Sequence, residues 1–69
     1  DISVYQPSNN KIAITGIEIN TEIELMNLNG KTIMSSVSSD TNTVLNVENL
    51  PKGLYLLHIG NTIKKVLLK

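Results

Sequence analysis

The chain has 69 residues, 41% of them hydrophobic, and its six acidic residues balance six lysines to a formal net charge of zero. This length allows one domain with one modest core, and the hydrophobic content excludes a disordered chain. No cysteine is present, so disulfides and thiolate metal sites are excluded. The neutral charge argues against a nucleic-acid role, and no apolar run approaches the ~18 residues of a membrane span.

β-branched residues dominate the apolar content, with nine Ile and five Val beside six Thr, whereas Phe and Trp are absent. Such side chains fit a pleated strand, so the composition favours an all-β fold. Alternating apolar positions, separated by turn residues, predict seven short strands. In chain order these are residues 2–4, 11–15, 22–28, 31–37, 43–47, 54–59 and 62–69, with residues 6–10 and 38–42 as loops. We expect a seven-stranded antiparallel immunoglobulin-like β-sandwich that forms a single domain over residues 1–69.

Turn residues predict how the strands are connected. Asn29-Gly30 predicts a two-residue type I′ turn, because both residues tolerate positive φ. A break in the alternation predicts a bulge or register change near Met26. Residues 50–53 predict a tight turn with Pro51 at its second position. Gly60-Asn61 predicts another two-residue hairpin turn.

The strand over residues 54–59 carries apolar side chains on both faces. Tyr55, Leu57 and Ile59 share one face, and Leu54 and Leu56 share the other. A strand that is apolar on both faces is expected in the middle of a sheet, and we predict this position for it.

Residues for catalysis are not assembled in any recognisable pattern. The single histidine, His58, lies within an apolar strand, and we expect a structural role for it. No nucleophile elbow, zinc-helix motif or phosphate-binding glycine loop is present. Asp40, Asn42 and Glu48 offer oxygen ligands for calcium, but their spacing matches no calcium loop. We predict that the domain is not an enzyme and has no catalytic residue, cofactor or metal.

Charge is distributed unevenly along the chain. Residues 1–48 hold all six acids and two lysines, a net charge of −4, whereas residues 49–69 hold four lysines and no acid, a net charge of +4. Lysines on an edge strand commonly keep that edge soluble. The alternative is a basic tail presented to a receptor.

Four motifs in series resemble those of the carboxy-terminal sorting domains of the type IX secretion system. Residues 50–59 are similar to the family's P-x-G-x-Y-x-V-x-I box, and residues 64–69 to its lysine-led apolar ending. Residues 26–31 resemble its D-L-x-G-K turn, with Asn27 where Asp is commoner. Residues 5–12 loosely resemble its Y-P-N-P opening, with Gln6 at the first proline. The resemblance spans essentially the whole chain.

The resemblance implies a domain at the extreme carboxy terminus of a protein exported across the outer membrane of certain Gram-negative bacteria. Such domains fold in the periplasm as immunoglobulin-like sandwiches and are recognised by the outer-membrane translocon. A cell-surface sortase then typically cleaves them, and the cargo is often joined to a lipopolysaccharide anchor at the cell surface. No signal peptide opens the chain, so we expect this segment not to be the amino-terminal end of its parent protein.

Two alternatives use the same fold for another task. One is a docking module that stays attached to a component of the secretion machinery. The other is an adhesion or ligand-binding sandwich. Carbohydrate binding is the obvious ligand class for such a sandwich, but only Tyr5 and Tyr55 are available to stack on sugar rings.

The motifs also imply which residues carry recognition. We expect Gly53 to be needed because the chain passes its neighbours closely there, and the Tyr55 hydroxyl to reach a partner at the rim. Lys65 and Lys69 are favoured as recognition residues, because exposed lysines add little to a core. The last strand also offers an edge to a partner strand or to a second copy in a weak homodimer. The full set of motif and recognition candidates is Gly30, Pro51, Gly53, Tyr55, Lys64, Lys65, Val66, Leu68 and Lys69.

Overall fold

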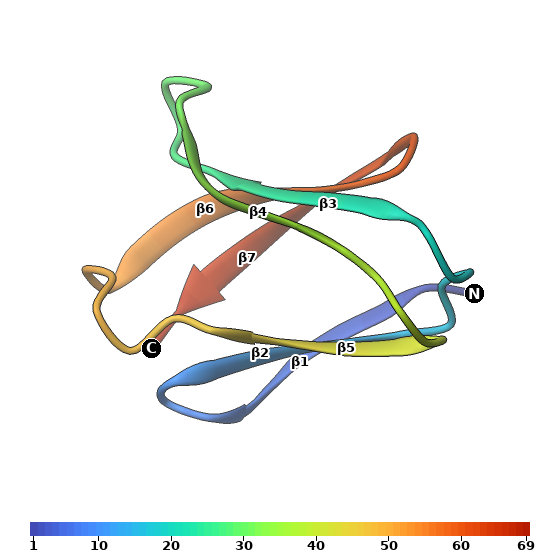
Figure 1. Cartoon of the computed structure of the whole chain (residues 1–69). Helices are drawn as coiled ribbons and strands as arrows, with labels where there is room; N and C mark the ends of the chain where they lie inside the picture. The colour runs from blue at the N-terminus through green and yellow to red at the C-terminus, as the bar shows by residue number, and fades with distance from the viewer.

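Seven antiparallel strands in two sheets make up the protein, as the computed structural model of residues 1–69 shows (Figure 1). One sheet has the strand order β1-β2-β5 and the other the order β4-β3-β6-β7. The structure contains no helix with the length and hydropathy that a membrane span needs. The predicted number of strands is confirmed, although the first strand continues past Val4 to Ser8. The strands are β1 (Ser3–Ser8), β2 (Lys11–Thr15), β3 (Glu22–Met26), β4 (Thr32–Val37), β5 (Asn42–Asn46), β6 (Gly53–Ile59) and β7 (Thr62–Leu68).

The core lies between the two sheets and consists of aliphatic side chains with one tyrosine. Alternate residues of each strand point inward, as the period of two in a pleated strand requires. β6 lies between β3 and β7, so its predicted central position is confirmed. The buried cluster comprises Ile12, Ile14, Ile17, Ile23, Leu25, Leu45, Val47, Tyr55, Leu57, Ile59, Val66 and Leu68.

The connection between β3 and β4 differs from the predicted type I′ turn. Asn29 does not have positive φ, whereas Gly30 does, at +86°. The Gly30 amide donates to the Asn27 carbonyl at 3.0 Å, and the Asn27 amide donates to the Lys31 carbonyl at 3.0 Å. This is a three-residue loop, in which a type I turn is followed by a glycine in the left-handed region.

The physical reason for the longer loop is the side chain of Asn27. Its Oδ1 accepts hydrogen bonds from the amides of Asn29, at 2.9 Å, and Lys31, at 3.0 Å. Such local bonding is what makes Asn and Asp favourable in turns. The predicted register change near Met26 is confirmed, because the β3–β4 register shifts between Leu25 and Met26.

The turn before β6 differs from the prediction, whereas the hairpin between β6 and β7 agrees with it. The hydrogen-bonded turn before β6 lies three residues earlier than predicted, since the Leu50 amide donates to the Val47 carbonyl at 3.1 Å. Leu50 and Lys52 lie in bends, and Pro51 between them has no assigned turn. At the other end of β6, Ile59 pairs with Thr62 across Gly60-Asn61, which confirms the two-residue hairpin. Gly60 alone has positive φ there, at +57°, the pattern of a type II′ turn.

A buried serine joins the two loops at one end of the sandwich. The Ser38 hydroxyl donates to the Glu18 carbonyl at 2.7 Å and accepts from the Thr21 amide at 2.9 Å. Its backbone donates to the Thr21 carbonyl and accepts from the Asn20 amide. All the polar groups of Ser38 are therefore paired, as a buried polar residue requires.

Candidate functional site

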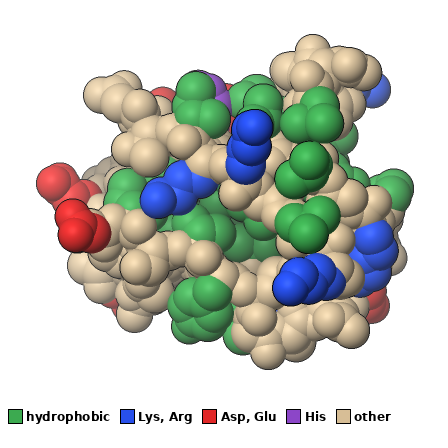
Figure 2. Space-filling view, turned by 180° about the vertical axis from the view of Figure 1, so that it is seen from behind, with side chains coloured by type: hydrophobic (Ala, Val, Ile, Leu, Met, Phe, Trp, Pro, Cys, Tyr) green, Lys and Arg blue, Asp and Glu red, His purple; other side chains and the backbone are tan.

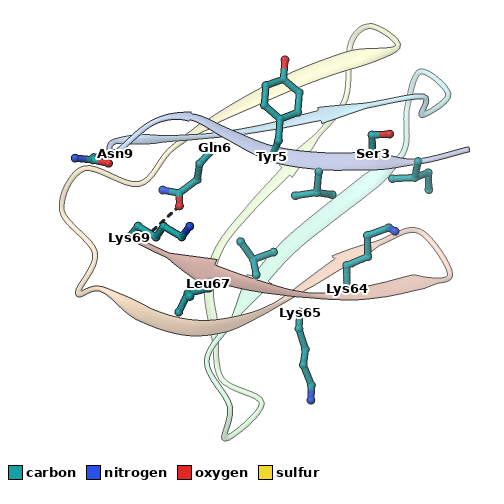
Figure 3. Close-up of a pocket in the computed structure, with 11 residues that line it drawn as sticks. Ser3, Tyr5, Gln6, Asn9, Lys64, Lys65, Leu67 and Lys69 are labelled. Atoms are coloured by element: carbon teal, nitrogen blue, oxygen red, sulfur yellow. Dashed lines mark hydrogen bonds between the residues drawn. The ribbon is translucent and has the colours of Figure 1, made fainter.

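A groove of about 830 Å³ runs between β1 and β7 on one side of the sandwich (Figure 3). β1 is the outermost strand of the three-stranded sheet, and β7 is the outermost strand of the four-stranded sheet. Each strand pairs with only one neighbour, so each borders the groove with a free edge. The site is thus the gap between the edges of two different sheets.

The hairpin register shows which backbone groups of β7 face the groove. In a two-residue hairpin the residues that flank the turn, here Ile59 and Thr62, form a hydrogen-bonded pair. Hydrogen-bonded and non-hydrogen-bonded pairs then alternate along an antiparallel ladder. The N–H and C=O groups of Ile63, Lys65 and Leu67 therefore point away from β6, toward the free side of the strand.

The groove is positively charged. Its lining includes Lys64, Lys65 and Lys69 but no acidic residue. Lys64 is half-buried and points toward β1, whereas Lys65 is exposed and points away from β1 (Figure 3). Lysine side chains surround a hollow with apolar side chains on this face of the molecule (Figure 2). A ligand in the groove would therefore meet both positive charge and apolar surface.

One side-chain contact closes the groove at the carboxy-terminal end of β7. The Lys69 amide donates to Gln6 Oε1 at 3.1 Å (Figure 3). The other amide atom of the same side chain, Gln6 Nε2, is buried and has no hydrogen-bond partner. Gln6 therefore leaves one unsatisfied donor at the groove.

Comparison with known protein families connects this fold to a function. Residues 3–69 match the family described as the secretion system C-terminal sorting domain. The chain belongs to this sorting-domain family. No curated protein and no solved structure matches the chain. The predicted resemblance is confirmed over almost the whole chain, and the domain is a carboxy-terminal sorting signal for type IX secretion. Such a signal directs export through the outer membrane, toward the cell surface or the medium.

The candidate residues at the end of the sorting domain separate into two groups. Val66 and Leu68 belong to the core, with exposed fractions of 8% and 2%. Lys65 and Lys69 are exposed, and Lys64 is half-buried. In the folded domain a receptor therefore has access to the three lysines but little access to the side chains of Val66 and Leu68.

Pro51 and Tyr55 meet in one hydrogen bond. The Tyr55 ring is buried, and its hydroxyl donates to the Pro51 carbonyl at 2.6 Å. The hydroxyl proton is thus used within the domain, where sequence reasoning expected it to reach a partner. The bond holds the bend before β6 against the strand itself.

The two candidate glycines serve the backbone of the sorting domain. A Cβ added at Gly53 would meet nothing within 4 Å, so the expected close passage of the chain is wrong. What Gly53 supplies is its φ of +144°, which side-chain-bearing residues rarely adopt. Gly30 supplies the left-handed position of the β3–β4 loop and does not line the groove.

The residues considered for calcium binding and the single histidine do not form a site together. Asp40 accepts a hydrogen bond from the Thr41 amide at 2.6 Å, and no three His, Cys, Asp or Glu side chains come together to hold a metal ion. His58 lies half-buried on β6, opposite Glu24 of β3 and Ile63 of β7.

Sequence reasoning missed the first strand as part of the site. Gln6 and Lys69 are 63 positions apart and belong to different sheets, so no local pattern connects them. The one available signal was the predicted immunoglobulin-like architecture. In the observed sheet orders the first and last strands are both edge strands, and they border the same groove.

Proposed function

We propose that residues 1–69 act as a single sorting domain whose address is the basic end of the chain, residues 64–69. The match of residues 3–69 to the sorting-domain family carries this proposal. The burial pattern supports the choice of residues, because Lys65 and Lys69 are exposed while Val66 and Leu68 are core residues. Gly30, Pro51, Gly53 and Tyr55 then maintain the fold that displays this end.

The partners of the domain would be the outer-membrane translocon and a cell-surface sortase. In this proposal the domain folds in the periplasm, is recognised there, and is cleaved once the parent protein reaches the surface. It has no catalytic role of its own. A weak homodimer would pair through an edge strand, and β4 has no charged residue to oppose this, whereas β7 carries two lysines.

We also propose that the sandwich is immunoglobulin-like. The sheet orders correspond to strands A-B-E and C′-C-F-G, with the fourth strand beside the third as C′ lies beside C. Tyr55 supports this correspondence, because it lies near the start of the sixth strand and bonds to the backbone four residues upstream. That contact is the tyrosine corner of immunoglobulin-type sandwiches.

A reporter fusion tests the sorting function. Residues 1–69, placed at the carboxy terminus of a periplasmic reporter, should bring the reporter to the surface of a host with type IX secretion. A host strain without this system should keep the reporter in the periplasm. A fusion that stays in the periplasm of both strains would contradict the sorting proposal.

A charge-reversal pair tests the address. The combination of Lys65→Glu and Lys69→Glu should leave the reporter in the periplasm while the domain stays folded, because both side chains are exposed. The matched control combines Lys11→Glu and Lys31→Glu, which make the same charge change at exposed positions outside the groove. Equal export of the two double variants would show that the address lies elsewhere.

A further inference from the structure

We propose that the groove between β1 and β7 binds an extended, acidic segment of a partner protein, which adds as a strand along the free edge of β7. The inference rests on the proposed function for the nature of the partner, a component that recognises the sorting domain. It goes further by naming the surface, the conformation of the bound segment and its charge.

The backbone of β7 supplies the first argument. Ile63, Lys65 and Leu67 direct their N–H and C=O groups away from β6, as the hairpin register requires. Lys69 is the next residue in this alternation, and its amide does donate toward β1, to Gln6 Oε1. The free donors and acceptors of β7 thus face the groove, and an extended segment can pair with them as an added strand.

The side chain of Gln6 supplies the second argument. Its Nε2 is buried without a hydrogen-bond partner, although nearly all buried polar groups in folded proteins have one. Gln6 lines the groove, so a turn of its side chain would bring Nε2 to a carbonyl or carboxylate oxygen of a segment bound there. Gln6 therefore has a donor that the folded domain leaves unused and that a bound segment can satisfy.

Charge decides which segment fits. Lys64, Lys65 and Lys69 line the groove, and no acidic residue does. A second copy that paired through its own β7 would bring lysines close to lysines, and like charges across a strand pair are destabilising. An acidic segment would instead neutralise them.

Lys64 adds selectivity to this surface. It occupies an inward-facing position of β7, on the same face as Val66 and Leu68, yet it stays half-buried at the open side of the core. Inward-pointing charges on edge strands are a known defence against unwanted strand pairing. A partner with a carboxylate at this point neutralises the Lys64 charge, so its strand can pair with β7. A neutral or basic segment leaves that charge uncompensated.

Peptide binding to the isotope-labelled chain, followed by NMR, tests the proposal. The probe is a capped nine-residue peptide that alternates glutamate with valine, and the matched peptide has lysine in place of each glutamate. We expect the glutamate peptide to bind at least tenfold more tightly and to shift the amide signals of Ile63, Lys65 and Leu67 and the side-chain amide of Gln6. Equal binding of the two peptides, shifts confined to β4 and β5, or no binding at millimolar peptide would overturn the proposal.

Two further peptides separate strand addition from simple charge attraction. Both have the glutamate–valine sequence with alternate backbone amides methylated, one peptide for each phase, so that in one of them the edge facing β7 loses its donors. We expect at least a tenfold loss of affinity for one phase. Unchanged affinity for both phases would overturn the proposal.

Variants of the chain complete the test. Lys64→Glu should weaken glutamate-peptide binding at least tenfold, whereas Lys31→Glu, at an exposed position outside the groove, should leave it unchanged. Sedimentation that showed a stable dimer through β7 would also overturn the proposal, since a second copy would then be the occupant. Normal export of the reporter fusion without peptide binding would reject the groove proposal alone. Peptide binding without export would instead count against the sorting function.

Discussion

Two buried polar side chains hold the irregular parts of this domain in place. Tyr55 bonds to the bend at Pro51, and Ser38 bonds to the loop that contains Glu18 and Thr21. Both side chains bond to backbone groups that have no partner in a strand ladder. Buried unpaired polar groups are costly, so these hydrogen bonds stabilise the fold beyond what the packing of the two side chains contributes.

Tyr55→Phe tests the first of these contacts. The variant keeps the buried ring and removes the hydroxyl that donates to the Pro51 carbonyl. We expect the free energy of unfolding to fall by about 1–2 kcal/mol, the usual contribution of such a bond with its acceptor left unpaired. Urea unfolding measures the change, and Tyr5→Phe at an exposed position is the matched control. An equal effect of the two variants would contradict the role given to this hydroxyl.

Ser38→Ala tests the second contact. The variant leaves the Thr21 amide and the Glu18 carbonyl without this partner in a part-buried site. A loss of about 2–3 kcal/mol is expected, since two hydrogen bonds disappear at once. Thermal unfolding should show it, with the exposed neighbour Ser39→Ala changing stability by less than about 0.5 kcal/mol. A small effect at Ser38 would mean that water replaces the hydroxyl.

At the scale of elements, the β3–β4 loop and β7 show how local geometry follows from single side chains. Asn27 caps its loop through two hydrogen bonds to its side-chain oxygen. In β7 the alternation buries Val66 and Leu68 and exposes Lys65 and Leu67. From Lys65 to Leu68, successive side chains therefore lie alternately on the surface and in the core.

Substitution of Asn27 tests the loop. Asn27→Asp keeps the oxygen acceptor and should change the free energy of unfolding by less than about 0.5 kcal/mol. Asn27→Ala removes it and should cost about 1–2 kcal/mol, because two loop amides lose their partner. Urea unfolding of the two variants compares them directly. Equal stability of the two variants would contradict the capping role.

For the whole molecule, the carboxy-terminal residues are both part of the core and part of the exposed edge. A domain of 69 residues is expected to have a stability of only about 3–10 kcal/mol. Val66 and Leu68 are two of the twelve core residues, so the fold depends on the same strand that carries the proposed address.

Deletion of residues 66–69 should therefore unfold the domain. It removes two buried aliphatic side chains and three of the seven residue pairs of the β6–β7 ladder. One Leu→Ala change in a core already costs about 2–5 kcal/mol. Circular dichroism should show loss of the cooperative transition, whereas Lys69→Ala should preserve it. A folded deletion variant would contradict this dependence. Loss of export on deletion thus reports on folding, and the charge-reversal pair is the sharper test of the address.

The sequence by itself determined the number of strands, the central position of β6 and the Gly60-Asn61 hairpin. These features depend on alternation and on turn residues a few positions apart, which are local in the chain. The family motifs were readable for the same reason, since each occupies one turn or one strand. The Asn29-Gly30 turn was predicted wrongly because the Asn27 side chain stabilises a three-residue loop through its hydrogen bonds to two loop amides.

Only the tertiary structure decided the site. The groove needs β1 and β7, which are separated by almost the whole chain and pair with different sheets. Packing of the sheets brings Gln6 to Lys69, buries Val66 and Leu68, and leaves three lysines around a free strand edge. Sequence periodicity reports which face of a strand is buried, but it does not report which distant edge lies beside it, because that contact exists only after the two sheets have packed.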